Sequence, residues 1–167
     1  MCGHVGSGVF EMIKVNLYAF GKIKEDYFLS GEEEYAKRLK KFCEFNVFEI
    51  KDQPLKSESD AEIDRALERE ADAFFRAIKG EYYAFAVEGK SVTSEKFAKI
   101  ISSQIDCGKD VNFVIGSSYG LSPRVKSGAT GLISFSAATF PHTLFRLIAC
   151  EQIYRAFTII SGATYHK

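Results

Sequence analysis

The segment 111–142 decides the fold class of this chain. It opens with VNFVI (111–115), an apolar run of strand-forming residues, and continues directly into the turn GSSYGLSP (116–123). A second short strand at 131–134 leads into another turn, FSAATFPH (135–142). Glycine lets the backbone of such turns approach a ligand closely. Two small-residue turns after short strands therefore indicate a site built from backbone groups, which suits a bound cofactor better than a metal ion or a hydrolytic triad.

Strand-like and helix-like segments alternate along the whole chain. The best-marked helix is 60–79, where Ser59 and Glu62 have the spacing of a capping box and Gly80 is the expected stop. We expect strands at 12–20, 43–50, 82–87, 111–115 and 131–134, and helices at 26–41, 60–79, 93–105, a short one opened by Ser122-Pro123, and 141–160. This alternation predicts one α/β domain over residues 12–167, with a mostly parallel sheet and helices on both faces.

Composition is that of a globular domain. The chain has 167 residues, of which 46% are hydrophobic, enough to bury a core without metal or disulfide support. Its four cysteines are scattered, with no C-x-x-C pair, so we expect reduced thiols in a cytoplasmic protein and no structural metal. Residues 1–11 lack the cationic start and apolar run of a signal peptide. We interpret them as an N-terminal extension, natural or introduced by cloning, outside the domain.

Charge is unevenly distributed along a chain of zero net charge. Residues 111–167 hold five basic residues and one acidic residue, a net +4, whereas residues 1–110 hold 17 basic and 21 acidic residues, a net −4. The basic residues of the last third are Arg124, Lys126, Arg146, Arg155 and Lys167. This stretch could present a basic face to a polyanion such as RNA, or the segregation could be chance.

The helix expected at 141–160 is apolar on nearly every side. Charged residues interrupt it too often for a membrane span, so it has to be buried all round. One sheet covers only one face, and a second copy of the chain is the natural cover for the rest, which predicts a homodimer. Glu151 and Arg155 form one polar stripe on this helix. The stripe is either a simple intrahelical ion pair or part of the lining of a cleft.

Ligands of open α/β sheets bind at the carboxyl ends of the strands, and the segments 84–89, 115–120 and 134–140 are candidates. Gly116 and Gly120 permit close backbone approach and positive φ, although a purely structural turn explains the same pattern. Neither a P-loop nor the dinucleotide fingerprint G-x-G-x-x-G is present. No G-x-S-x-G elbow occurs, and the last third has few carboxylates, which disfavours serine hydrolase, glycosidase and magnesium-dependent chemistry.

Four motifs resemble those of the ribosomal RNA large-subunit methyltransferase H family, a branch of the SPOUT methyltransferases. They are FVIGSSYGLSP, FSAATFPH, LFRLIACEQIYRAF and the terminal YHK, and the resemblance covers residues 12–167. It implies a homodimer with a C-terminal trefoil knot, a rare exception to the rule that chains avoid knots. It also implies S-adenosylmethionine as the cofactor, and methylation of N3 of a pseudouridine in large-subunit (23S) rRNA on assembled ribosomes.

The resemblance implies the site residues as well. The cofactor pocket corresponds to Phe85, Gly116, Phe135, Ser136, Ala137, Ala138, Thr139 and Phe140. Because the cofactor carries an activated methyl group, a cation beside the charge developing on the base is the main catalytic need. We expect Arg155 to be this cation, with Glu151 fixing its rotamer, while Tyr165 and His166 of the other subunit close over the target base. A buried structural pair and a frayed chain end are the alternative interpretations.

Arg124 and Lys126 lie beside the first turn and, with Lys167, are the expected contacts to RNA phosphates, solvated surface being the alternative. The sequence departs from the family pattern at Ser117, where glycine is common, and at Thr164 and Lys167, where proline and arginine are frequent. A serine there is strained if the position needs positive φ. A non-catalytic, ribosome-binding dimer that keeps the knotted fold is the alternative function.

Overall fold

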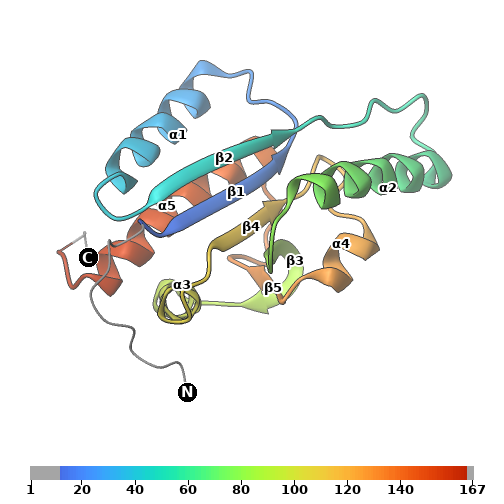
Figure 1. Cartoon of the computed structure of the whole chain (residues 1–167). Coiled ribbons are helices and arrows are strands. Elements are labelled where there is room, and N and C mark those ends of the chain that lie inside the picture. The colour runs from blue at the N-terminus through green and yellow to red at the C-terminus, as the bar shows by residue number, and fades with distance from the viewer. Residues whose placement is uncertain (1–11, 165–167) are drawn as a thin grey trace.

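The computed structural model describes residues 12–164, which form an α/β domain around one five-stranded sheet (Figure 1). All strand pairs are parallel, and the strand order is β2-β1-β4-β3-β5. In chain order the elements are β1 (Lys14–Phe20), α1 (Asp26–Leu39), β2 (Glu44–Ile50), α2 (Asp60–Ala77), β3 (Tyr83–Ser91), α3 (Ser94–Asp106), β4 (Val111–Ile115), α4 (Pro123–Gly128), β5 (Gly131–Ser134) and α5 (His142–Ile160). Every expected strand and helix is present, and the α/β class with a parallel sheet is confirmed.

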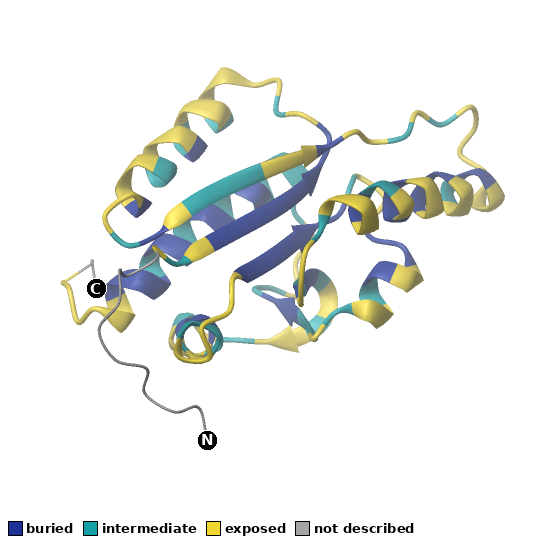
Figure 2. Ribbon diagram, in the orientation of Figure 1, coloured by how far each residue is buried: buried dark blue, intermediate teal, exposed yellow. Residues whose placement is uncertain are grey.

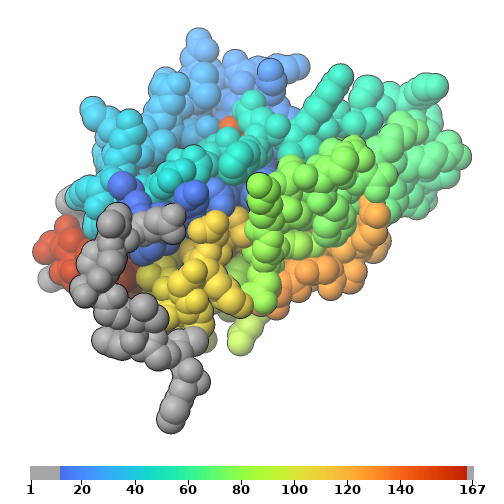
Figure 3. Space-filling model, viewed as in Figure 1, coloured from blue at the N-terminus to red at the C-terminus, as the bar shows by residue number. Residues whose placement is uncertain are grey.

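Helices cover both faces of the sheet, as predicted. On one face α1, α3 and α5 enclose a core that includes Phe113 and Ile153, and on the other α2 and α4 enclose a core around Phe74 and Val125. Neighbouring residues of a strand point to opposite faces, so β4 supplies Phe113 to the first core and Val114 to the second. Figure 2 shows β1 and β4 buried in the middle of the sheet. Figure 3 shows α2 and α4 packed side by side.

The two ends of α2 differ in how well the sequence predicts them. At its start, Ser59 Oγ accepts a hydrogen bond from the Glu62 backbone N–H at 3.3 Å, which confirms the cap. The expected stop at Gly80 is wrong by a few residues, because α2 ends at Ala77. Ile78 takes an extended backbone with ψ of 141° and packs against the second core, which draws the chain out of the helix.

α5 is covered by more than the sheet, because α1 and α3 flank it. Ala149, Ile153 and Ala156 have no exposed surface, whereas Ile159 and Ile160 at the C-terminal end are each 40% exposed. The two flanking helices thus supply much of the cover that the sequence assigned to a second chain. Within residues 12–164, no helix combines the length and apolar character that crossing a membrane requires.

A buried ion-pair network joins α5 to α1 and β2. Arg146 is only 4% exposed, and its guanidinium donates to both carboxylate oxygens of Glu32, with an Nη2–Oε1 distance of 2.9 Å. A further guanidinium nitrogen lies 3.0 Å from Glu49 Oε1. Charges taken out of water are tolerated only when they are paired, so these three residues depend on one another.

We expect Arg146→Leu to lower the free energy of unfolding by about 3–5 kcal/mol, because it leaves two carboxylates without their counter-ion. Urea denaturation at neutral pH measures the change. Arg38→Leu, which breaks the exposed pair with Glu34 on α1, is the matched control and should change stability little. Equal losses in the two variants would contradict this account of Arg146.

Candidate functional site

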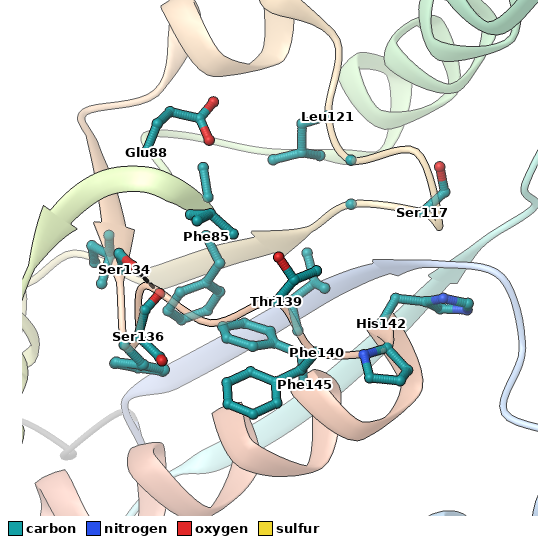
Figure 4. Close-up of a pocket in the computed structure, with 18 of the residues that line it drawn as sticks. Phe85, Glu88, Ser117, Leu121, Ser134, Ser136, Thr139, Phe140, His142 and Phe145 are labelled. Atoms are coloured by element: carbon teal, nitrogen blue, oxygen red, sulfur yellow. Dashed lines mark hydrogen bonds between the residues drawn. The ribbon is translucent and has the colours of Figure 1, made fainter.

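A cavity of about 670 Å³ lies at the carboxyl ends of β4 and β5 and beside the middle of β3, where the three candidate segments identified from the sequence meet (Figure 4). The first turn (116–123) follows β4, and its residues up to Leu121 contribute one wall. The second turn (135–142), whose last residue begins α5, follows β5 and forms another. Residues 85–88 of β3 and Phe145 of α5 complete the lining. Segments far apart in the sequence therefore meet at one edge of the sheet, as expected for a parallel α/β fold.

Backbone contact between two glycines closes the first turn. A Cβ atom on Gly116 would lie 2.8 Å from Gly120 Cα and closer still to the Gly120 carbonyl group, so no larger residue fits. Gly120 has a φ of +85°, which favours glycine. Ser117 and Gly120 exchange backbone N–H···O bonds of 3.2 and 2.9 Å. Positive φ among residues 12–164 is confined to glycines, so Ser117 is accommodated without the strain considered above.

A buried acid that the sequence did not reveal holds Ser117 in place. Ser117 Oγ donates a hydrogen bond to Oε2 of this acid, Glu70, at 3.0 Å. Glu70 also accepts a hydrogen bond from the Gln53 backbone N–H at 3.0 Å. Glu70 is 4% exposed; burial raises the pKa of its carboxyl, and nearby Asp52 adds to this, while both hydrogen bonds oppose it. Helical spacing was the one sequence signal for the burial of Glu70. It lies four residues before the buried Phe74 and so on the same face of α2.

Hydrogen bonds inside the second turn fix its shape. Ser134 Oγ donates to the Ser136 carbonyl oxygen at 2.9 Å, drawn as a dashed line in Figure 4. Ser136 Oγ in turn accepts from the Ala138 backbone N–H at 2.9 Å. Both hydroxyls are engaged within the loop, so their role is to shape its main chain along the cavity.

Phenylalanine rings form the floor of the cavity. The Phe85 ring centroid lies 5.1 Å from that of Phe135 and 5.3 Å from that of Phe145. Phe85 also stacks on Phe113 of β4 at 5.3 Å, which ties the floor to the core. Packed rings of this kind present flat apolar surfaces. The floor is therefore suited to a planar, apolar part of a ligand.

The structure brings together the residues expected to hold a cofactor. Seven of the eight line the cavity: Phe85, Gly116, Phe135, Ser136, Ala138, Thr139 and Phe140. The eighth, Ala137, lies in the same turn but outside the lining. Their contact with a cofactor stays a prediction.

Two polar pairs at the cavity were missed from the sequence. Lys126 Nζ donates to Glu88 Oε1, and this hydrogen bond lowers the pKa of the Glu88 carboxyl. Ser118 Oγ lies 3.2 Å from His142 Nδ1 and so links the two turns. Glu88 falls within the candidate segment 84–89, so the sequence did indicate that it lies near the site. No local pattern indicates its partner Lys126, which is 38 residues away.

Arg155 and Glu151 form the expected pair but lie away from the cavity of their own chain. Arg155 Nε and Nη2 donate to Glu151 Oε1 at 2.9 and 2.6 Å. Neither side chain is part of the lining. Arg155 is ten residues beyond Phe145, the last cavity residue of α5, which corresponds to about 15 Å along a helix. The other two predicted catalytic residues, Tyr165 and His166, lie outside the described residues.

The charge asymmetry of the sequence is largely cancelled in the fold. Arg124 forms ion pairs with Glu68 and Asp72 of α2, and Lys126 pairs with Glu88. Arg146 is buried against acids of α1 and β2, as described above. The remaining predicted RNA contact, Lys167, lies outside the described residues. Basic residues of the last third thus pair mainly with acids of the first two thirds, so their count alone does not indicate a basic surface.

Thiols and metal ligands add no further chemistry to the described part of the chain. Cys43 and Cys150 are buried free cysteines, and burial raises the pKa of Cys43 to about 12 and raises that of Cys150 as well. Neither buried thiol is therefore ionised at neutral pH. Across residues 12–164, no cluster of three or more His, Cys, Asp or Glu side chains could hold a metal ion.

Comparison with known proteins shows the family. The solved SpoU methyltransferase AviRb from Streptomyces viridochromogenes, in complex with the cofactor AdoMet, is similar with a TM-score of 0.45 and 12% identity, covering 94% of this chain and 61% of that chain. Ribosomal RNA large subunit methyltransferase H of Limosilactobacillus reuteri is 46% identical over 159 residues, and that of Streptococcus uberis is 42% identical over 160 residues; each match covers 93% of this chain and 100% of the relative. A family model described as "Predicted SPOUT methyltransferase" matches residues 13–166. The chain therefore belongs to the SPOUT methyltransferase family, in the branch of ribosomal RNA large subunit methyltransferase H.

Proposed function

We propose that this protein transfers a methyl group from S-adenosylmethionine to N3 of a pseudouridine in large-subunit (23S) rRNA, acting on assembled ribosomes in the cytoplasm. The observation that carries the proposal is the cavity, where seven of the eight residues expected to hold the cofactor lie together. The relatives that bear the name of an rRNA methyltransferase match this chain from end to end of their own sequences, which supports the same substrate class here.

The cavity fits S-adenosylmethionine in size and in character. Its volume of about 670 Å³ is in the range of small-ligand pockets. The phenylalanine floor matches the flat adenine ring, and the main chain of the second turn offers polar groups for the edge of that ring. When bound, the cofactor supplies an activated methyl group. The protein has to hold the cofactor, orient the base and stabilise charge on it.

Arg155 is the residue proposed to stabilise that charge. Pseudouridine N3 loses its proton as the methyl group arrives, and negative charge develops on the ring. A guanidinium fixed beside the ring lowers the energy of this state. Two hydrogen bonds to Glu151 hold the guanidinium in one orientation. Tyr165 and His166 are proposed to close over the base.

The proposed homodimer brings Arg155 of one subunit to a cofactor held by the other. In its own chain the residue lies outside the cavity, about 15 Å along α5 from Phe145. Ile159 and Ile160, one turn further on, expose 40% of their surface and are an apolar patch that a second subunit could cover. In a two-fold dimer the same patch serves both subunits. Each proposed active site combines the cavity of one subunit with Arg155 of the other.

The proposed fold includes the C-terminal trefoil knot of the family. The first and second turns are in contact through Ser118 and His142, and α5 then runs back across the sheet to pack against α1. Passage of the second turn through the loop between β4 and β5 would hold both main chains around one ligand. Threaded chains are exceptional, so this arrangement needs direct observation in a crystal structure with S-adenosylmethionine bound.

For RNA, Arg124 and Lys167 stay the proposed phosphate contacts. The Arg124 side chain is 46% exposed, and the acids that pair with it, Glu68 and Asp72, are about equally exposed. Exposed ion pairs contribute little stability, so a phosphate group can compete for the guanidinium.

The activity is tested by incubating the protein with labelled S-adenosylmethionine and either intact ribosomes or free rRNA. We expect methyl transfer to intact ribosomes, with mass mapping placing the product on N3 of a pseudouridine. Calorimetric titration with S-adenosylmethionine separates this function from that of a non-catalytic ribosome-binding dimer. A dimer that no longer binds the cofactor would give no binding heat. Methylation of a different RNA nucleotide would overturn the proposed specificity but leave the reaction class standing.

Gly116→Ala should abolish cofactor binding, because its methyl group would collide with the backbone of Gly120 and open the first turn. We expect calorimetry to show an affinity for S-adenosylmethionine that is at least about 100-fold weaker, because the opened turn no longer makes its close contacts with the ligand. Gly131→Ala is the matched control, since a Cβ there meets only the Tyr83 side chain at 3.4 Å. Normal affinity in Gly116→Ala would show that the turn is not part of the site.

Arg155→Ala should eliminate methyl transfer while the affinity for S-adenosylmethionine is retained. Mixing it with Gly116→Ala then tests the composite site. Purified mixed dimers should recover roughly half of the wild-type rate, because one of their two sites combines an intact cavity with an intact Arg155. If Arg155 acts within its own chain, the mixed dimers will be as inactive as either parent.

A further inference from the structure

We propose that Glu88 and Lys126 bind the amino-acid end of the cofactor, with Glu88 accepting hydrogen bonds from its α-ammonium group and Lys126 donating to its α-carboxylate. This inference rests on the proposed function and adds a binding subsite to it. Lys126, expected from the sequence to contact RNA, is thereby assigned to the cofactor.

The first reason is that the cavity has one polar partner of each sign. Among the described residues that line it, Glu88 is the only carboxylate and Lys126 the only ammonium. The remaining lining is apolar or hydroxyl-bearing, apart from His142, which contacts Ser118. A zwitterion bound at the rim of a cavity is stabilised by a partner of opposite charge for each of its two groups. Only this pair offers both.

The second reason is position. Glu88 lies three residues after Phe85 on β3, a distance of at most about 10 Å along an extended chain. In Figure 4 the Glu88 carboxylate lies at the upper edge of the cavity, on the other side of Phe85 from Phe145. Side-chain exposures of 55% for Glu88 and 32% for Lys126 place the pair at the rim. With the adenine ring on the phenylalanine floor, the flexible amino-acid end of the cofactor points toward this rim.

The third reason is electrostatic matching. Lys126 lowers the pKa of the Glu88 carboxyl, which is therefore ionised at neutral pH. The pair has zero net charge, and so has an α-amino acid group. The two can associate in an antiparallel arrangement in which every charge gains an opposite neighbour, and charge-assisted hydrogen bonds are the strong ones. Each side chain is already held near the rim by the other, which reduces the ordering cost of binding.

Two neutral-sulfur analogues isolate this contact. S-adenosylhomocysteine carries the amino-acid end, whereas 5′-methylthioadenosine lacks it but keeps the adenosine and thioether. We expect wild-type protein to bind the first more tightly, and Glu88→Gln with Lys126→Met to weaken S-adenosylhomocysteine binding by about tenfold while leaving methylthioadenosine affinity unchanged. Calorimetric titration of both analogues into the wild type and into the double variant measures these four affinities. Each single variant should show part of the loss.

The matched control removes a different exposed ion pair, Glu81 with Lys109, whose atoms lie 2.8 Å apart away from the cavity. Glu81→Gln with Lys109→Met should bind both analogues as the wild type does. Equal weakening of both analogues in the Glu88 and Lys126 variant, or no change in either, would overturn the subsite while leaving the cofactor assignment intact. If the wild-type protein binds neither analogue nor S-adenosylmethionine, the proposed function fails and the subsite with it.

Discussion

The close approach of the Gly116 and Gly120 backbones is the constraint on which the site depends. It turns the chain sharply at the end of β4, beside Phe85 of β3, and leaves the space above the phenylalanine floor open to the second turn. Glu70 supports the same turn from α2 through Ser117. A side chain at Gly116 would collide with the Gly120 backbone, and the positive φ of Gly120 is one that residues with a side chain rarely adopt, so the turn depends on glycine at both positions.

Binding and catalysis are proposed to come from different subunits. The cavity is complete within one chain, with its floor anchored to the core through Phe113. The proposed catalytic cation, Arg155, instead lies toward the exposed end of α5, near Ile159. This division separates the two requirements physically. Cofactor affinity is then a property of the single chain, whereas turnover is a property of the assembled pair, and substitutions at the α5 end affect the second without the first.

Local patterns predicted the elements, and non-local pairing is what they could not predict. β4 and its turn were found because an apolar run followed by glycine is a local signal, and the resemblance supplied the cavity residues. The partners Glu70 and Ser117, Glu88 and Lys126, and Glu32 and Arg146 are 47, 38 and 114 residues apart. Whether they meet depends on the strand order β2-β1-β4-β3-β5 and on the face that each helix covers, which no run of residues encodes. For the same reason, the basic residues of the last third did not reveal their acidic partners in the first two thirds.

The place of β5 has a consequence for biosynthesis. It pairs with β3 at the edge of the sheet, and the second turn and α5 follow it. A nascent chain emerges from its N-terminus, so the earlier strands are available before either the last wall of the cavity or the helix that covers one face. A chain that stops after β4 contains four of the five strands but lacks the second turn and α5, which line the cavity. The proposed cofactor site can therefore form only after the second turn and α5 have been synthesised.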